Sequence, residues 1–147
     1  MPYSKHKGGY LFSNDKRLLQ LHLIHQFLSA KSYWSKGIPL AVVKESIRGS
    51  ACFGVYHKKR QIGFARVITD YATFGYLADV FILPEYRGRG LSKQLMAFII
   101  KFPRFTGLRR FMLATRDAHS LYAQHGFSSL AEPQRFMERK SFETYPA

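Results

Sequence analysis

Residues 79–92 combine the residue types best suited to binding an anion. The segment reads Asp-Val-Phe-Ile-Leu-Pro-Glu-Tyr-Arg-Gly-Arg-Gly-Leu-Ser and leads from an apolar strand into an amphipathic helix. The first N–H groups of a helix lack partners within it, and the helix dipole is positive at that end, so phosphate binds there. Glycine lets the backbone approach an anion, and arginine adds charge and paired donors. The sequence therefore predicts a diphosphate-binding loop formed by Arg87, Gly88, Arg89, Gly90, Leu91 and Ser92.

The loop does not fit the common nucleotide-binding templates. The chain contains no G-x-x-x-x-G-K-[ST] phosphate loop, and no G-x-G-x-x-G followed by an acidic residue about 20 positions later. A second distinctive segment lies downstream, at residues 118–127, and reads Ala-His-Ser-Leu-Tyr-Ala-Gln-His-Gly-Phe. A glycine hinge between strand and helix is the alternative for the loop. The order of its residues, the long apolar strand before it and this second segment favour a functional role.

Together the two segments resemble motifs of the GNAT superfamily of N-acetyltransferases. Arg87–Ser92 is similar to the Q/R-x-x-G-x-G/A loop that binds acyl-CoA, with Ser92 in place of the final Gly or Ala. Residues 118–127 are similar to A-x-x-L-Y-x-x-x-G-F, in which the tyrosine often acts as general acid. Thr115 departs from the asparagine that helps many members hold CoA. The resemblance covers roughly residues 50–130 and implies acetyl-CoA as cosubstrate.

The hydrophobic pattern predicts a single domain, 1–147, of mixed α/β class. A strongly twisted sheet with helices on both faces follows from the order β-α-α-β-β-β-α-β-α-β. We expect strands at 10–13, 51–57, 61–70, 73–83, 109–115 and 134–140. We expect helices from Asn14 or Asp15 to about 30, from Pro39 to about 48, from 91 to about 102, and over 118–125.

The resemblance also implies where the cofactor lies. Strand 73–83 should separate from strand 109–115 and leave a gap for the acyl-pantetheine arm. The arm would pair like an added strand with the backbone of Val80, Phe81 and Ile82. The adenosine diphosphate end would lie on residues 87–92, with the acceptor entering from the opposite side.

Acetyl transfer needs a deprotonated amine, a stabilised oxyanion and a protonated thiolate. Tyr122 is the predicted acid, and a strand N–H from Phe81 or Ile82 could stabilise the oxyanion. Asp79 is the best candidate for the base, because a carboxylate on an apolar strand is costly unless it is paired or functional. An ion pair of Asp79 with an arginine, or a proton path through water, are open alternatives. Asp70 ends the preceding strand and is a further carboxylate on the substrate side.

The acceptor side should be covered by the loop after the first helix, so Tyr33 and Trp34 are predicted to line the substrate site. Aromatic core packing is the alternative for both. His22 and His25 are three residues apart, but with no nearby carboxylate or cysteine they make a weak metal site, and we expect no metal.

Composition and charge narrow the function classes. The chain has 147 residues, one cysteine and a formal net charge of +14. It has no apolar run long enough to span a bilayer and no signal-peptide pattern at its start, and we expect a cytoplasmic protein. The charge favours a small amine acceptor that carries a carboxylate or phosphate over a polycation. A homodimer is possible, and the rival function is a noncatalytic module that binds CoA, or binds nucleic acid through the basic loop.

Overall fold

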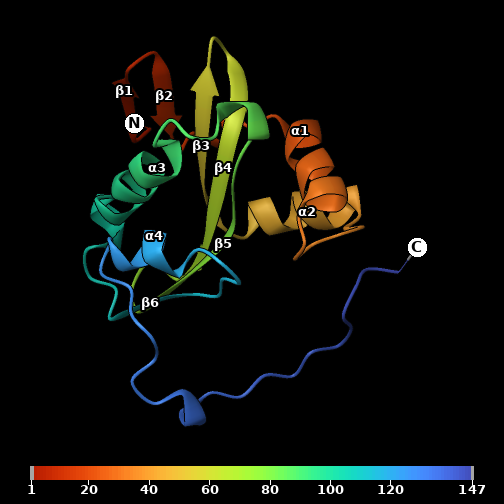
Figure 1. Cartoon of the computed structure of the whole chain (residues 1–147), viewed down its shortest axis with the longest axis vertical. Coiled ribbons are helices and arrows are strands. Elements are labelled where there is room, and N and C mark those ends of the chain that lie inside the picture. The colour runs from red at the N-terminus through yellow and green to blue at the C-terminus, as the bar shows by residue number, and fades with distance from the viewer. Residues whose placement is uncertain (1, 147) are drawn as a thin grey trace.

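The computed structural model describes residues 2–146 and shows a six-stranded sheet with helices on both sides (Figure 1). The strands follow chain order across the sheet, and all neighbours are antiparallel except the last two, which are parallel. They are β1 (Ser4–Lys7), β2 (Tyr10–Ser13), β3 (Ala51–His57), β4 (Arg60–Thr69), β5 (Phe74–Ile82) and β6 (Arg110–Leu113). The predicted mixed α/β fold is confirmed.

Two pairs of helices cover the sheet. On one side lie α1 (Leu21–Gln26), which continues as a π-helical turn η2 (Phe27–Lys31), and α2 (Leu40–Arg48). On the other lie α3 (Leu91–Ile100) and α4 (His119–Ala123). Short 3-10 turns are η1 (Lys16–Leu18), η3 (Pro84–Tyr86), η4 (Pro103–Phe105) and η5 (Pro133–Arg135). No helix in residues 2–146 combines the length and apolar character that crossing a membrane requires.

The structure differs from the expected elements at three places. Strand β1 was not predicted, because its residues Ser-Lys-His-Lys are all exposed and show no hydrophobic alternation. Asp15 caps the 3-10 turn η1 by accepting a hydrogen bond from the Arg17 N–H, and the α-helix begins only at Leu21. The strand predicted at 134–140 is wrong: η5 overlaps the start of the segment, and no strand follows it within residues 2–146.

Strand β5 contains a bulge where it pairs with β4. Phe64 faces Phe81 and Arg66 faces Ala78, so one β4 residue between them stands opposite two β5 residues. Asp79 takes the extra position with a φ of 56°, in the left-handed region that asparagine and aspartate tolerate best among non-glycine residues. The bulge re-aims the side chains of β5 just before the strand reaches the candidate site.

The hydrophobic core lies on both faces of the central strands and is rich in aromatic rings. Phe53 of β3 is fully buried and makes edge contacts with Phe98, Phe102 and Phe105, with ring centroids 5.6 to 6.2 Å apart. On the opposite face Phe27 stacks on Phe81 at 4.0 Å. The core therefore ties α3 and η4 to one face of the sheet and η2 to the other.

Replacing Phe53 with alanine should leave a large cavity beneath three rings. We expect Phe53→Ala to lower the free energy of unfolding by about 3–5 kcal/mol, as measured by urea denaturation. Val42→Ala, at a position 40% exposed on α2, is the control and should change stability by less than about 0.5 kcal/mol. Equal losses in the two variants would contradict this account of the core.

Candidate active site

A gap opens between β5 and β6 partway along their length. The two strands pair only over four positions, from Phe74 opposite Arg110 to Leu77 opposite Leu113. Beyond Leu77, β5 continues to Ile82, and no described residue pairs with it on that side. The separation expected from the resemblance is therefore present, and Val80, Phe81 and Ile82 lie along it.

Along β5, the N–H and C=O groups of successive residues point alternately toward β4 and toward the gap. This alternation identifies the backbone groups that face the gap. The Leu83 N–H donates to the Ile62 carbonyl on the β4 side at 2.8 Å. Successive residues of a strand point their N–H and C=O groups in opposite directions, so those of Ile82 point away from β4. The Ile82 carbonyl accepts a 3.2 Å bond from Arg87 Nε. By the same alternation the N–H of Val80 also points away from β4, so β5 presents the N–H groups of Val80 and Ile82 to the gap.

The predicted diphosphate loop opens α3. Gly88 and Gly90 have φ of 79° and 75°, a conformation that strains residues with a side chain. A Cβ on Gly88 would meet no atom within 4 Å, so open space borders the loop there. Within residues 2–146 the N–H groups of residues 88–92 make no hydrogen bond. This is the free-donor arrangement that binds anions at a helix N-terminus.

A cavity of about 290 Å³ adjoins this loop and extends to α4. Its walls include Arg87, Gly88, Gly90, Leu91 and Ser92 from the predicted loop, with Ile82 from β5. Leu121 of α4 and Gln124, the residue that caps its C-terminal end, also line the cavity and were not predicted. The i, i+3 spacing of these two residues places them on one helix face, and that spacing was the available signal.

The two arginines of the loop differ in their surroundings. Arg87 lines the cavity. Arg89 turns toward β2, where it donates to the Tyr10 hydroxyl at 2.9 Å and lies 5.0 Å over the Tyr86 ring. The structure therefore places Arg87, rather than Arg89, at the cavity.

The Asp79 carboxylate is buried and fully engaged. One oxygen accepts a bond from Trp34 Nε1 at 2.9 Å, and the other accepts from Arg66 Nε at 2.6 Å. Arg66 also donates to the Ser50 hydroxyl at 3.1 Å. The ion pair left open by the sequence is thus present, and it fixes the Trp34 ring beside β5.

Tyr33 and Trp34 come together with the predicted catalytic residues. Their rings meet edge to face at 5.0 Å. The Tyr33 hydroxyl accepts from the Arg116 N–H at 3.1 Å, and the Arg116 guanidinium lies 3.8 Å from the Tyr33 ring centre. Sequence reasoning missed Arg116, because nothing in the local pattern distinguishes it from the other basic residues of the chain.

Tyr122 is 8% exposed, on α4. Burial, with a smaller contribution from nearby Tyr33, raises the pKa of Tyr122 to about 12. The phenol is therefore protonated at neutral pH, as a general acid must be. Its ring contacts Phe127 edge to face at 6.0 Å, which joins the middle of the downstream segment to its last residue.

Asp70 lies apart from this group, in the turn between β4 and β5. Its carboxylate accepts bonds from the N–H groups of Ala72, Thr73 and Phe74 and from the Thr73 hydroxyl. These hydrogen bonds lower the pKa of Asp70. The residue stabilises the hairpin and is not assembled with Asp79 and Tyr122.

No group of three or more potential metal ligands occurs within residues 2–146. His25 Nε2 instead lies 2.9 Å from the Ile38 carbonyl, a contact that joins α1 to the loop before α2. The arrangement of the site is that of an anion-binding loop, an open strand edge and a buried phenol.

Comparison with known proteins agrees with this geometry. Residues 21–127 match the family described as Acetyltransferase (GNAT) family. A protein of the GNAT family from Xanthomonas campestris pv. campestris has a solved structure that is 52% identical, with a TM-score of 0.89. The match covers 92% of this chain and 95% of that one.

Two further relatives extend the comparison. A protein of Gibberella zeae named as an acetyltransferase is 34% identical over 144 residues, covering 84% of this chain and 81% of its own length. The structure of Rv2747 from Mycobacterium tuberculosis, which contains CoA, shares the fold at 17% identity and a TM-score of 0.62, over 75% of this chain and 67% of that one. The chain belongs to the GNAT family of acetyltransferases.

Proposed function

We propose that this chain is an N-acetyltransferase that transfers the acetyl group of acetyl-CoA directly to a primary amine of a small acceptor. The observation that carries the proposal is the continuity of the free N–H groups at the start of α3, their cavity and the open edge of β5. A diphosphate on the loop would lead its pantetheine arm along that edge. Family membership and the CoA found in Rv2747 support acetyl-CoA as the cosubstrate.

The reaction needs few groups from the protein. The amine nitrogen attacks the thioester carbonyl carbon, a C–N bond forms, and the carbonyl oxygen becomes an oxyanion. The Ile82 N–H faces the gap and would stabilise this charge. The C–S bond then breaks, and the departing thiolate takes a proton from the Tyr122 hydroxyl, which recovers it from solvent.

The contacts of Asp79 bear on which group takes the proton from the acceptor amine. For Asp79 to accept a proton it would have to give up a bond from Trp34 or from Arg66. We therefore assign Asp79 to positioning Trp34 at the acceptor side, and the amine proton to water. In this proposal Tyr33 and Trp34 form the wall that the acceptor meets.

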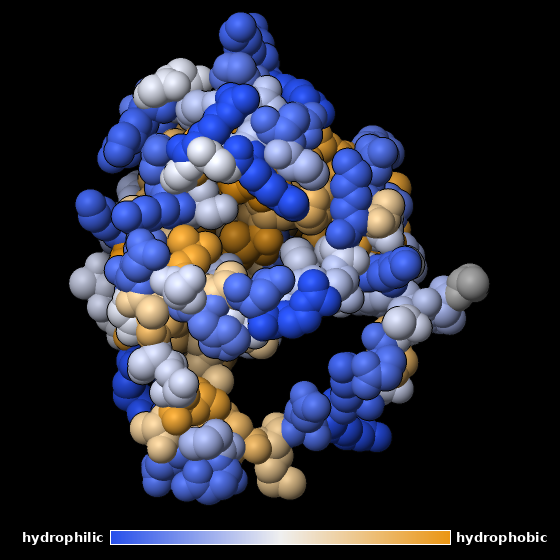
Figure 2. Space-filling model, in the orientation of Figure 1, coloured by the Kyte–Doolittle hydropathy of each residue, from blue (hydrophilic) through white to orange (hydrophobic). Residues whose placement is uncertain are grey.

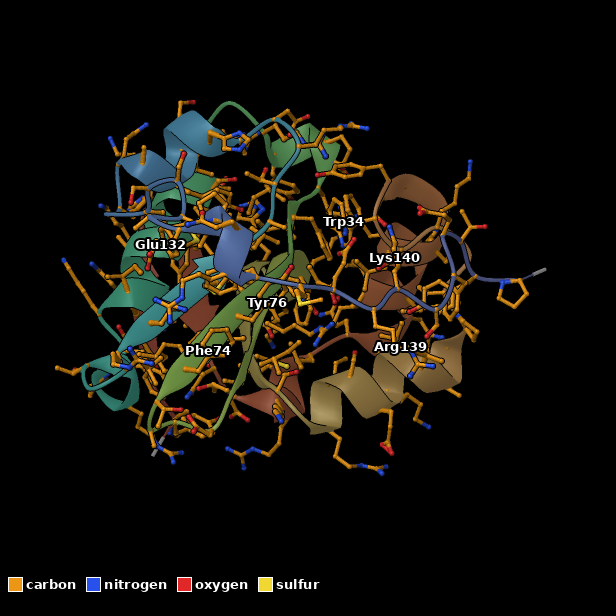
Figure 3. The ribbon with its side chains drawn as sticks, turned by 90° about the horizontal axis from the view of Figure 1, so that it is seen from below. Trp34, Phe74, Tyr76, Glu132, Arg139 and Lys140 are labelled. Carbon is orange, nitrogen blue, oxygen red and sulfur yellow. The ribbon has the colours of Figure 1, made fainter. Side chains whose placement is uncertain are left out.

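The acceptor is proposed to carry an anionic group in addition to its amine. The chain has 23 basic and 9 acidic residues, so its field attracts anions. Arg116 places a guanidinium against Tyr33 at the expected entrance. The basic residues Arg139 and Lys140 lie on the same side of the molecule as Trp34 (Figure 3).

Binding of acetyl-CoA tests the loop directly. Calorimetry should show that Arg87→Ala weakens binding about tenfold, equivalent to about 1.4 kcal/mol. Arg104→Ala is the matched control, because Arg104 stacks on Tyr71 at 3.7 Å, outside the cavity walls. An equal loss in both variants would assign the effect to overall charge, and no binding by the unaltered protein would overturn the proposal.

Removing the Tyr122 hydroxyl should affect chemistry and leave binding intact. We expect Tyr122→Phe to lower kcat by about 10²–10⁴-fold with an unchanged Kd for acetyl-CoA, and Tyr71→Phe to do neither. Because the phenol stays protonated below its pKa of about 12, kcat of the unaltered protein should not fall between pH 8 and pH 10. A fall in that range that disappears in Tyr122→Phe would contradict the assignment.

A panel of amines tests the acceptor class. The value of kcat/KM should be highest for small amines bearing a phosphate or carboxylate, lower for neutral amines and lowest for polyamines. Arg116→Ala should reduce the preference, whereas Arg48→Ala, which removes the partner of Glu45 on α2, should not. A clear preference for polyamines would exclude an anionic acceptor while leaving acetyl transfer itself intact.

A further inference from the structure

The loop that leads into α3 leaves its backbone donors free, so it cannot use them to hold its own shape. Within residues 2–146 the N–H groups of residues 88–92 have no hydrogen-bond partner. The last bonded N–H groups before them are those of Tyr86 and Arg87, which donate to the carbonyls of Leu83 and Pro84. Figure 2 shows mainly hydrophilic side chains at the end of the molecule where the β3–β4 turn and the start of α3 lie. Specific side-chain contacts are therefore needed to restrain the loop.

Two side chains of this segment reach out of the loop to the ends of β2 and β3. The Tyr86 hydroxyl lies 2.9 Å from His57 Nδ1, and the two rings meet edge to face with centroids 5.4 Å apart. The Arg89 guanidinium donates to the Tyr10 hydroxyl at 2.9 Å and to the Glu85 carbonyl at 3.4 Å. The loop is thus tied to strands that lie far from it in the sequence.

The contacts among these side chains form a closed cycle. Tyr10 and His57 stand opposite each other in the pairing of β2 with β3, and their ring centroids are 5.1 Å apart. The Tyr86 ring meets the Tyr10 ring edge to face at 6.2 Å, and the Arg89 guanidinium lies 5.0 Å over the Tyr86 ring. We call Tyr10, His57, Tyr86 and Arg89 the loop clamp. In a cycle of this kind, each member restricts the positions of its neighbours.

The other contacts of the segment hold it less firmly. Arg60 pairs with Glu85 at 3.3 Å, but their side chains are 52% and 54% exposed, and an ion pair so exposed contributes little. Arg87 Nε donates to the Ile82 carbonyl at 3.2 Å, a contact that stays within the same stretch of chain. The loop clamp is therefore the main restraint that fixes the loop relative to β2 and β3.

We infer that the loop clamp positions the free N–H groups of residues 88–92 for the diphosphate of acetyl-CoA, an inference that rests on the proposed function. It also gives a role to Arg89, whose guanidinium is turned away from the cavity that Arg87 lines. A loop that is already ordered loses less freedom when it binds a ligand, so the clamp raises affinity. Its members are positioning residues, and the chemistry of acetyl transfer does not depend on them.

Two variants release the clamp from the side that faces away from the cofactor. Tyr10→Phe removes the hydroxyl that accepts from Arg89, and His57→Leu removes the partner of the Tyr86 hydroxyl. Neither Tyr10 nor His57 lines the cavity, so an effect on acetyl-CoA must act through the loop. Calorimetry should show Kd raised about threefold to tenfold in each variant. With the best amine of the panel and saturating acetyl-CoA, kcat should stay within about twofold of its original value.

Matched variants separate positioning from general effects of the substitutions. Tyr71 also carries an arginine on its ring, Arg104 at 3.7 Å, and Tyr71→Phe should change neither Kd nor kcat. His57→Asn, which keeps a polar group near the place of Nδ1, should recover part of the affinity that His57→Leu loses. Unchanged Kd values in both Tyr10→Phe and His57→Leu would overturn the inference.

A direct contact between Arg89 and phosphate is the competing explanation. If Arg89 acts through the clamp, Tyr10→Phe should change Kd by less than about twofold once Arg89→Gln is already present, because the two residues act as one unit. If Arg89 binds phosphate itself, Tyr10→Phe frees its guanidinium to do so. Tighter binding of acetyl-CoA by Tyr10→Phe than by the unaltered protein would therefore overturn the inference.

Limited trypsin digestion without cofactor tests the restraint of the loop independently of acetyl-CoA. Mass spectrometry should show cleavage after Arg87 and Arg89 about threefold to tenfold faster in Tyr10→Phe and His57→Leu, because proteolysis follows the population of the opened loop. Cooperative thermal unfolding confirms that each variant is folded. Equal cleavage together with normal acetyl-CoA binding would overturn the clamp alone. Faster cleavage in the variants, with no acetyl-CoA binding by the unaltered protein, would overturn the proposed function and the cofactor role of the clamp.

Discussion

The candidate site depends on how β5 is released from β6 while it remains bound to β4. Pairing with β6 ends at Leu77, and the bulge at Asp79 begins two residues later. Residues beyond the bulge stay anchored by Phe64 opposite Phe81 and by the bond from Leu83 to Ile62. One edge of β5 is thus held by β4 and the other edge is free. A ligand can pair with the free edge with little further loss of backbone entropy, because the strand is already ordered. The proposed groove for the cofactor thus lies where a further strand could pair with β5.

Electrostatic balance at the bulge explains why a carboxylate is tolerated there. Asp79 has a side-chain exposure of 6%, and Arg66 has 16%. Burying either charge alone would cost several kcal/mol, and leaving one unpaired by mutation is more harmful than replacing both. The Asp79 carboxylate also accepts the Trp34 N–H, so the group that pairs with Arg66 also attaches the loop that carries Trp34 to the sheet. The contacts of Asp79 with Arg66 and Trp34 therefore contribute both to the stability of the sheet and to the arrangement of the candidate site.

The types and order of neighbouring residues predicted those parts of the candidate site that depend on local backbone conformation. The positive φ of Gly88 and Gly90 and the free N–H groups before α3 follow from residue type and order. The partners of Asp79 could not be deduced, because Trp34 and Arg66 come from distant elements and the bulge that joins them depends on strand register. Strand β1 was missed because its exposed residues show no hydrophobic alternation. The pattern of residues 134–140 predicted a strand, but within residues 2–146 this segment is not part of the sheet.

The position of β6 sets the far wall of the gap. This strand is held to the sheet by four residue pairs with β5, from Phe74 opposite Arg110 to Leu77 opposite Leu113. A cosubstrate arm that paired with the free edge of β5 would lie between the two strands beyond those pairs. Its binding would therefore stabilise the arrangement in which the ends of β5 and β6 stand apart.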